Sequence, residues 1–244
     1  MDSVPYVLFD LDDTLYPAGA GLKQEISVRI TRYVAEHLAV SLDAADALRR
    51  EYYQRYGSAV RALVVNHRLD LAEFLAFAHE VNVERYLTPD ADLDCLLGCI
   101  RAPKAIFTNA PHLYAERVLR ALGIDRHFAD VFDYEFGYYR GKPDVTVYRQ
   151  VQAALAGSDS GRPLVMVDDA AKNLAPAHAL GWKTIWVNPA QRVAEVEADY
   201  MVQDLWQVAQ AFQQLGAMDD AHRVMANHRL AGCAWVKRSR TDAQ

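Results

Sequence analysis

Residues 6–17, YVLFDLDDTLYP, decide the fold of this chain. The stretch starts with a short apolar run, Tyr6 to Phe9, and passes directly into the acids Asp10, Asp12 and Asp13. A continuous apolar run, with no alternation of apolar and polar positions, predicts a strand buried on both faces. Acids placed directly after such a strand indicate a polar site at the carboxyl end of a parallel sheet.

Similar apolar runs recur along the chain and alternate with segments of helical periodicity. Five more runs are predicted as strands: 104–108 (KAIFT), 130–132, 164–167 (LVMV), 183–187 (KTIWV) and 200–202. Helices are predicted between and after them at 111–122, 145–156, 171–180 and 204–215, each ending at a glycine or just before one. This alternation predicts an α/β fold with a Rossmann-like, doubly wound parallel sheet.

The region between the first two predicted strands breaks this rhythm. It shows no strand pattern, and helices are predicted at 22–37, 42–65 and 71–79. We therefore expect three parts: a core domain formed by 1–16 and 90–215, a helical cap at 17–89, and a C-terminal extension at 216–244 to which no role is assigned.

Composition narrows the classes of partner. The net charge of −6 argues against non-specific nucleic-acid binding, which needs a basic surface, but it leaves room for a small anion held by a few local cations. No run approaches the roughly 20 apolar residues of a membrane span, and no signal-peptide pattern is found. Cys95, Cys99 and Cys233 lack zinc-site spacing and are expected to be buried apolar residues, which favours a reducing, cytoplasmic setting.

Polar residues follow three of the predicted strands and also occupy one loop. Besides the first acidic run, Thr108 and Asn109 follow the second strand, Asp168 and Asp169 follow the LVMV strand, and Lys142 lies in a Gly-Lys-Pro-Asp loop. Because the carboxyl ends of parallel strands meet at one edge of a sheet, we expect these residues to converge.

Several carboxylates in one place repel each other, and a divalent cation removes that cost. A cluster of oxygen ligands suits Mg²⁺, which binds through carboxylates, water and substrate phosphate. Lys142, Thr108 and Asn109 could donate hydrogen bonds to phosphoryl oxygens. The residues therefore predict a magnesium site for a phosphate ester.

Each motif taken alone has a structural alternative. An Asp-x-Asp pair or the Thr108–Asn109 pair could cap a helix, Lys142 could be a surface lysine, and the pair at 168–169 could interact with a helix dipole. The four motifs occur together and in order, each after a strand or in a connecting loop, and this conjunction favours one shared site.

The quoted segments resemble a known family. FDLDDTLY (9–16), FTNA (107–110), GKPD (141–144) and VDDAAKN (167–173) are similar to the four ordered motifs of the haloacid dehalogenase (HAD) superfamily, over about residues 4 to 190. The helical insert resembles the C1-type cap of that family. FDLDDTLYP, YYQRYGSAVRALV from Tyr52 onward, IFTNAPHLYAERVL (106–119) and VDDAAKN more narrowly resemble the pyrimidine 5′-nucleotidase subfamily.

The resemblance implies a role for each core residue. Asp10 would be the nucleophile that forms an aspartyl-phosphate intermediate, and Asp12 the general acid and base, with a pKa raised by the neighbouring Asp10 charge. Thr108 and the backbone amide of Asn109 would hold the phosphoryl oxygens. Lys142 would neutralise developing charge and orient Asp10.

The implied cofactor is Mg²⁺, bound by Asp10, the backbone carbonyl of Asp12, and the pair Asp168 and Asp169. Asp169 aligns best as the direct ligand, and Asp168 would act directly or through water. A dehalogenase of the same family also uses the aspartate nucleophile, but it needs neither the metal nor the second acid. The presence of Asp12 therefore favours a phosphatase.

The cap is expected to set the substrate. Tyr52 and Tyr56 would share one helix face with Arg61 nearby, and Tyr16 would form a pocket wall beside the catalytic loop; packing is the alternative explanation for the tyrosines. We expect a pyrimidine nucleoside 5′-monophosphate such as UMP or CMP as substrate, and a monomer or homodimer. A phosphatase for a sugar phosphate, phosphoglycolate or pyridoxal phosphate, or a non-catalytic binding protein, remains an alternative.

Overall fold

A computed structural model of the chain describes residues 4–56, 59–67, 69–156, 161–189 and 197–218. Six strands form one parallel sheet in the order β3-β2-β1-β4-β5-β6. Their bounds are β1 Tyr6–Phe9, β2 Lys104–Phe107, β3 Asp130–Phe132, β4 Leu164–Asp168, β5 Lys183–Val187 and β6 Tyr200–Val202. The predicted doubly wound parallel sheet is confirmed, with one-residue differences at the ends of β2 and β4.

In this strand order, β2 and β3 lie to one side of β1, and β4, β5 and β6 lie to the other. The order of the strands therefore reverses between β1 and β4. In such sheets a ligand crevice forms at that reversal, outside the carboxyl ends of the strands. Phe9 is in register with Val167 on β4, and the backbone N–H of Asp10 donates to the Val167 carbonyl at 2.8 Å. Asp10 therefore lies at the edge of the sheet level with the end of β4.

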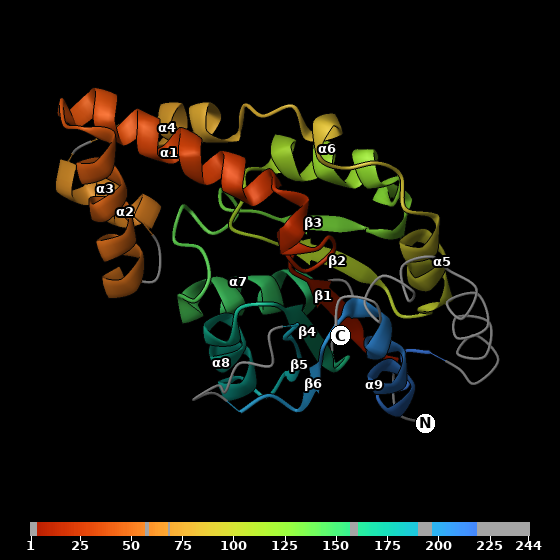
Figure 1. Ribbon diagram of the computed structural model, residues 1–244. Helices are drawn as coiled ribbons and strands as arrows, with labels where there is room; N and C mark the ends of the chain where they lie inside the picture. Colours follow the sequence, from red (N-terminus) through yellow and green to blue (C-terminus); the bar gives the residue numbers. More distant parts are fainter. Residues whose placement is uncertain (1–3, 57–58, 68, 157–160, 190–196, 219–244) are drawn as a thin grey trace.

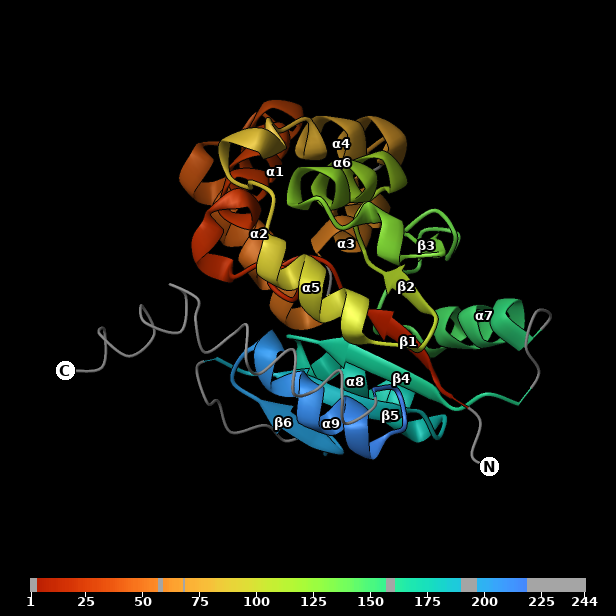
Figure 2. The same cartoon turned by 90° about the vertical axis from the view of Figure 1, so that its right-hand side faces the viewer.

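Helices cover both faces of the sheet, as Figures 1 and 2 show. One face packs against α5 (Ala91–Cys99), α6 (His112–Leu122) and α9 (Val208–Gln214), and the other packs against α7 (Val145–Ala156) and α8 (Ala171–Ala179). Alternate residues of β1 serve the two cores: Phe9 meets Phe212 of α9, whereas Leu8 belongs to the cluster around α7 and α8. This two-sided burial explains the continuous apolar run of β1.

Local signals account for several helix ends. The Asp90 carboxylate accepts hydrogen bonds from the N–H groups of Asp92 and Leu93 and so caps α5, while α6 ends at Gly123, which has a φ of 71°. The helix expected at 204–215 is divided into a short 3₁₀ helix, Leu205–Gln207, and α9. Asp204 accepts the Gln207 N–H at the start of that 3₁₀ turn.

The insert between β1 and β2 is helical, and its described residues from 17 to 89 contain no strand. It comprises α1 (Leu22–Leu38), α2 (Leu42–Tyr56), α3 (Ala59–His67) and α4 (Leu71–His79), with a 3₁₀ turn at Val83–Arg85. The helix expected over 42–65 is wrong, because two helices occupy that range. Gly57 and Ser58 lie outside the described residues.

The insert has an apolar cluster of its own, centred on Tyr33, Leu63 and Phe74. Tyr134, from the loop after β3, joins this cluster, so the insert and the sheet domain share buried contacts there. In Figure 1, α1 to α4 gather to one side of the sheet, above the edge where β1 ends.

At the C-terminal end, Ala217 and Met218 still pack into the core. Most of the expected extension, 219–244, lies outside the described residues, and so does Cys233. Among the helices that the structure describes, none combines the length and the apolar character that crossing a membrane requires.

Candidate active site

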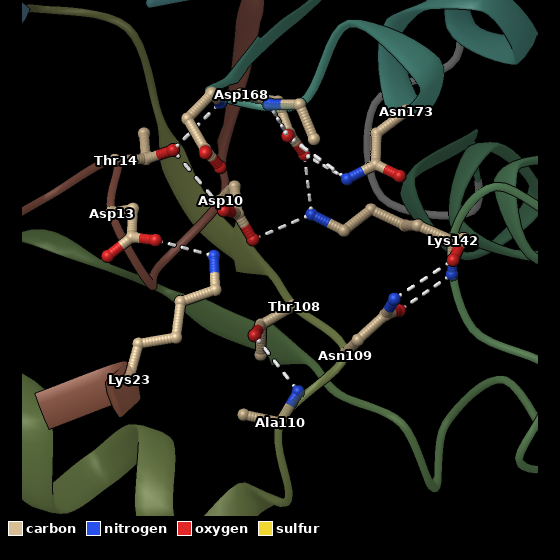
Figure 3. A network of polar contacts seen from close by, with 12 residues as sticks. Asp10, Asp13, Thr14, Lys23, Thr108, Asn109, Ala110, Lys142, Asp168 and Asn173 are labelled. Atoms are coloured by element: carbon tan, nitrogen blue, oxygen red, sulfur yellow. Dashed lines mark hydrogen bonds and ion pairs between the residues drawn. The ribbon is translucent and has the colours of Figure 1, made fainter. Parts of the chain in front are cut away.

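The carboxyl edge of the sheet brings the expected residues together. Asp10 follows β1, Thr108 and Asn109 follow β2, Asp168 is the last residue of β4, and Lys142 enters from the loop between β3 and α7. Figure 3 shows their side chains converging in one polar network.

Lys142 is the centre of this network. Its Nζ donates to Asp10 Oδ1 and to Asp168 Oδ2, both at 2.7 Å, and its side chain is only 1% exposed. Burial alone would lower the pKa of Lys142, but the carboxylates of Asp10 and Asp168 outweigh burial and raise it. Lys142 is therefore a fixed cation that joins the ends of β1 and β4.

Three carboxylates form a group that could hold a metal ion. Asp10, Asp168 and Asp169 each offer an oxygen, and these oxygens all lie within 4.8 Å of one another. Burial raises the pKa of Asp169 to about 7; the Lys23 cation opposes this, and the charges of Asp10 and Asp168 add to it. A divalent cation would relieve this cost, and an all-carboxylate donor set fits Mg²⁺.

Hydrogen bonds fix the carboxylates in place. Thr14 Oγ1 donates to Asp10 Oδ2 at 3.2 Å and accepts the backbone N–H of Asp169 at 3.0 Å, which ties the loop after β1 to the end of β4. Asn173 Nδ2 donates to both oxygens of Asp168, and the Ala170 N–H donates to Oδ1. Asp168 is fully buried, whereas Asp169 is partly exposed.

Thr108 and Asn109 have different surroundings. Thr108 is buried, and its Oγ1 accepts the Ala110 N–H at 3.0 Å. The side chain of Asn109 clamps the backbone of Lys142: Nδ2 donates to the carbonyl at 2.9 Å, and Oδ1 accepts the N–H at 2.6 Å. The side-chain amide of Asn109 is thus engaged with the lysine loop, which leaves the backbone amide as the group expected to meet a phosphoryl oxygen.

The carboxylate of Asp12 lies apart from the group of three acids described above. Its Oδ1 accepts hydrogen bonds from Tyr16 Oη and, at 2.8 Å, from Tyr114 Oη. Burial is the largest influence on Asp12 and raises its pKa; the Tyr16 hydrogen bond opposes this, and the Asp10 charge adds to it. A pKa raised by burial and a like charge is what a general acid requires.

Sequence reasoning missed three residues of the site. Lys23 of α1 forms an ion pair with Asp13 at 2.7 Å, and the carboxylates of Asp169 and Asp13 raise its pKa against the opposing effect of burial. Tyr114 reaches Asp12 from α6, and Asn173 reaches Asp168 from α8. Asn173 stands in the quoted VDDAAKN segment and Tyr114 in the quoted IFTNAPHLYAERVL segment, although no role was expected for either; nothing local in the sequence marks Lys23.

The expected substrate residues are less well defined. Tyr16 is 4% exposed and directs its hydroxyl to Asp12. Tyr52 is 9% exposed within the apolar cluster of the insert, and its hydroxyl lies 2.9 Å from His67 Nε2. The predictions for Tyr56 and Arg61 concern side chains outside the described part of α2 and α3.

Solved structures share this fold. A HAD phosphatase from Thermococcus onnurineus is 22% identical, with a TM-score of 0.62 over 88% of this chain and 99% of that one. The HAD-hydrolase YfnB from Bacillus subtilis, solved bound to magnesium, is 17% identical, with a TM-score of 0.60 over 87% and 100%. A dehalogenase solved with an intermediate complex is 19% identical, with a TM-score of 0.54 over 90% and 100%. At these identities the likeness concerns the fold alone.

A sequence relative and a family model are more specific. Phosphate metabolism protein 8 of Saccharomyces cerevisiae is 30% identical over an alignment of 134 residues, and the match covers 51% of this chain and 40% of the yeast protein. The match thus spans less than half of that relative. The model of haloacid dehalogenase-like hydrolases matches residues 4–181, which carry all four motifs. The chain therefore belongs to the haloacid dehalogenase-like hydrolase family.

Proposed function

We propose that this protein is a Mg²⁺-dependent phosphomonoester hydrolase that works through an aspartyl-phosphate intermediate. The observation that carries the proposal is the pairing of two acids in different settings. Asp10 lies beside the Lys142 cation, whereas Asp12 is held separately by phenol hydroxyls and has a raised pKa. A carboxylate fixed beside a cation suits a nucleophile, and a carboxyl group with a raised pKa suits an acid.

Asp10 would act as the nucleophile. One of its oxygens accepts from Lys142 and the other from Thr14, so the carboxylate has a fixed direction. It attacks phosphorus, the bond to the leaving oxygen breaks, and Asp12 gives that oxygen its proton. Asp12 then takes a proton from water, the hydroxyl attacks phosphorus, and phosphate departs to regenerate Asp10.

Mg²⁺ would be bound by Asp10, the Asp12 backbone carbonyl and Asp169, with Asp168 acting through water. This assignment follows from the hydrogen bonds that Asp168 already accepts from Lys142, Asn173 and Ala170. When bound, the ion supplies charge neutralisation for the phosphoryl oxygens and the carboxylates. Thr108 and the Asn109 amide would hold the phosphoryl oxygens opposite.

A dehalogenase shares the fold and the nucleophile, and solved dehalogenases resemble this chain in structure. Two features favour the phosphatase. A displaced halide needs no proton, so an acid with a raised pKa at position 12 would have no use in a dehalogenase. The carboxylate group at Asp10, Asp168 and Asp169 likewise fits a metal-dependent reaction.

For the substrate we propose a pyrimidine nucleoside 5′-monophosphate. The resemblance of the cap and β2 segments to the pyrimidine 5′-nucleotidases supports it, and the name of the yeast relative refers to phosphate metabolism. Sugar phosphates, phosphoglycolate and pyridoxal phosphate remain the alternative substrates. Phosphatases for these esters share the core motifs, so only the insert can distinguish one substrate from another.

The test is steady-state kinetics of the purified protein with p-nitrophenyl phosphate, UMP, CMP, AMP, a hexose phosphate, phosphoglycolate and pyridoxal phosphate. We expect turnover with Mg²⁺ and none with EDTA, and the largest kcat/KM for UMP or CMP. Asp10→Asn should eliminate turnover and trap no covalent phosphate, while Asp43→Asn, at an exposed position of α2, should be unaffected. Turnover without metal, or none with any ester, would reject the proposal.

A further inference from the structure

Two phenol hydroxyls converge on one oxygen of Asp12. Tyr16 Oη and Tyr114 Oη both donate to Asp12 Oδ1, and the two hydroxyl oxygens lie 3.3 Å apart. The two tyrosines are 4% and 2% exposed, whereas Asp12 is half-buried. Tyr16 comes from the loop after β1, whereas Tyr114 comes from α6, 98 positions further along the chain.

The insert contacts the Tyr114 ring from the other side. His79, the last residue of α4, packs edge-on against it with ring centroids 5.0 Å apart. His79 Nδ1 donates to the Leu75 carbonyl at 2.9 Å, and burial lowers the pKa of His79 to about 4, so the ring is neutral at neutral pH. Tyr114 therefore has its ring held by α6 and α4 and its hydroxyl directed at Asp12.

We propose that Tyr114 and Tyr16 are positioning residues for Asp12: they hold Oδ1, so that Oδ2 is the oxygen that exchanges the proton with the leaving group and then with water. The inference rests on the proposed function, in which Asp12 is the acid and base. Proton transfer needs heavy atoms roughly 2.6–3.2 Å apart, and a misplacement of about 1 Å costs about 100-fold in rate. Fixing one oxygen of a carboxylate defines where the other points.

A positioning role predicts that the loss of activity depends on the leaving group of the substrate. A role in the stability of the fold predicts no such dependence. An alkyl ester releases a poor leaving group and depends on protonation by Asp12, whereas p-nitrophenolate departs without it. Loss of the positioning hydroxyl should therefore slow phosphoryl transfer from the alkyl ester selectively, whereas hydrolysis of the aspartyl phosphate, which also uses Asp12, slows equally for both esters. The selectivity should appear in kcat/KM, because kcat/KM covers only the steps up to release of the leaving group.

The experiment compares Tyr114→Phe and Tyr16→Phe with a matched control, Tyr6→Phe. Tyr6 is also buried and also donates to a carboxylate, Asp130 Oδ2 at 3.2 Å, but it begins β1 at the far end of the sheet. For the best nucleotide or other alkyl ester we expect kcat/KM to fall about tenfold in Tyr114→Phe, a share of the 10²–10⁴ that acid–base catalysis supplies. With p-nitrophenyl phosphate it should fall less than about threefold, and Tyr6→Phe should change neither.

A second measurement asks whether the tyrosine acts through Asp12. In an Asp12→Asn background, with the same alkyl ester as substrate, Tyr114→Phe should cause no further loss of kcat/KM, because effects that pass through one group are not additive. A tyrosine that merely stabilises the fold would lower the rate by the same factor in both backgrounds.

The outcomes separate the inference from the proposed function. Equal losses of kcat/KM on aryl and alkyl esters, or additive losses in the Asp12→Asn background, would overturn the inference. The proposed function would still stand if the wild type shows Mg²⁺-dependent turnover. A wild type without Mg²⁺-dependent turnover rejects both. If circular dichroism shows that Tyr114→Phe is unfolded, the same comparisons are made with Tyr16→Phe, and the same outcomes support or overturn the inference.

Discussion

The side chain of Asn109 and the backbone of Lys142 form a two-bond clamp, with Asn109 Nδ2 donating to the Lys142 carbonyl at 2.9 Å and Oδ1 accepting its N–H at 2.6 Å. The clamp joins the end of β2 to the loop that delivers the lysine. Asn109 thus helps to position the Lys142 ammonium between Asp10 and Asp168, although its hydrogen bonds are to the backbone of Lys142 and not to the ammonium group.

Breaking the clamp should therefore weaken catalysis through Lys142. We expect Asn109→Ala to lower kcat by about tenfold or more, in line with the cost of small misplacements in active sites. Asn109→Asp should be as damaging, because a carboxylate cannot donate to the carbonyl. Asn66→Ala, on the exposed surface of α3, is the control. Wild-type kinetics in Asn109→Ala would show that the clamp has no catalytic consequence.

Gly141 lies next to the clamp and should tolerate no side chain. Its φ is +59°, and a Cβ at this position would lie 2.5 Å from the Tyr134 ring and 2.8 Å from Asn109 Oδ1. The left-handed backbone alone costs a non-glycine residue roughly 1–2 kcal/mol, and the contacts add to it. We expect Gly141→Ala to lower both the free energy of unfolding and kcat. Gly19→Ala, where a Cβ meets nothing within 4 Å, should change neither; urea unfolding measures the difference.

Lys142 should be important for stability as well as for catalysis. Replacing it by methionine leaves the carboxylates of Asp10 and Asp168 buried without their cation, and breaking a buried pair costs about 3–5 kcal/mol. Lys183 offers the matched control. Its ion pair with Asp199 at 2.6 Å is solvent-exposed, and such pairs contribute about 0–1 kcal/mol. Equal destabilisation of Lys142→Met and Lys183→Met would contradict the buried-network interpretation.

The parts of the fold that the sequence predicts are those fixed by local patterns. Two-sided burial imposes continuous apolar runs, and each of the six runs is a strand of the sheet. The carboxyl ends of parallel strands meet at a common edge, and this rule alone predicts that Asp10, Thr108, Asn109 and Asp168 lie near one another. The division of the expected helix 42–65 into α2 and α3 is not predicted, because the helical periodicity of the sequence runs on from one helix to the next.

What the sequence does not predict depends on contacts between distant segments. No local pattern says that the Asn109 side chain reaches the backbone of Lys142 rather than the substrate, or that Tyr114 meets Asp12 across 102 positions. The sequence predicts Tyr16 as a pocket wall, but it does not predict that the Tyr16 hydroxyl lies beside that of Tyr114, because this contact depends on how α6 packs. Such contacts follow from how helices pack on the sheet, and packing has no short sequence signature.

Magnesium should stabilise the folded protein through the carboxylate group. An ion that binds only the native state raises the free energy of unfolding by about 2.7 kcal/mol at a concentration 100 times its Kd. We expect thermal unfolding of the wild type to shift upward with Mg²⁺ and to return with EDTA. Asp169→Asn should abolish most of the shift. Asp43→Asn should keep it, and a shift retained in Asp169→Asn would place the ion elsewhere.

His79 should make stability depend on pH in the acidic range. Burial lowers the pKa of His79 to about 4, from a usual value of 6.5. Between these values the unfolded chain binds a proton that the folded chain does not, so the free energy of unfolding falls as the pH decreases from 6.5 to 4. His79→Phe keeps an aromatic ring against Tyr114 and removes the titration. Its unfolding free energy, measured by urea denaturation across this range, should therefore fall less steeply than that of the wild type. Other titrating groups contribute equally to both proteins, so parallel curves would mean that His79 is protonated as readily in the folded chain as in the unfolded one.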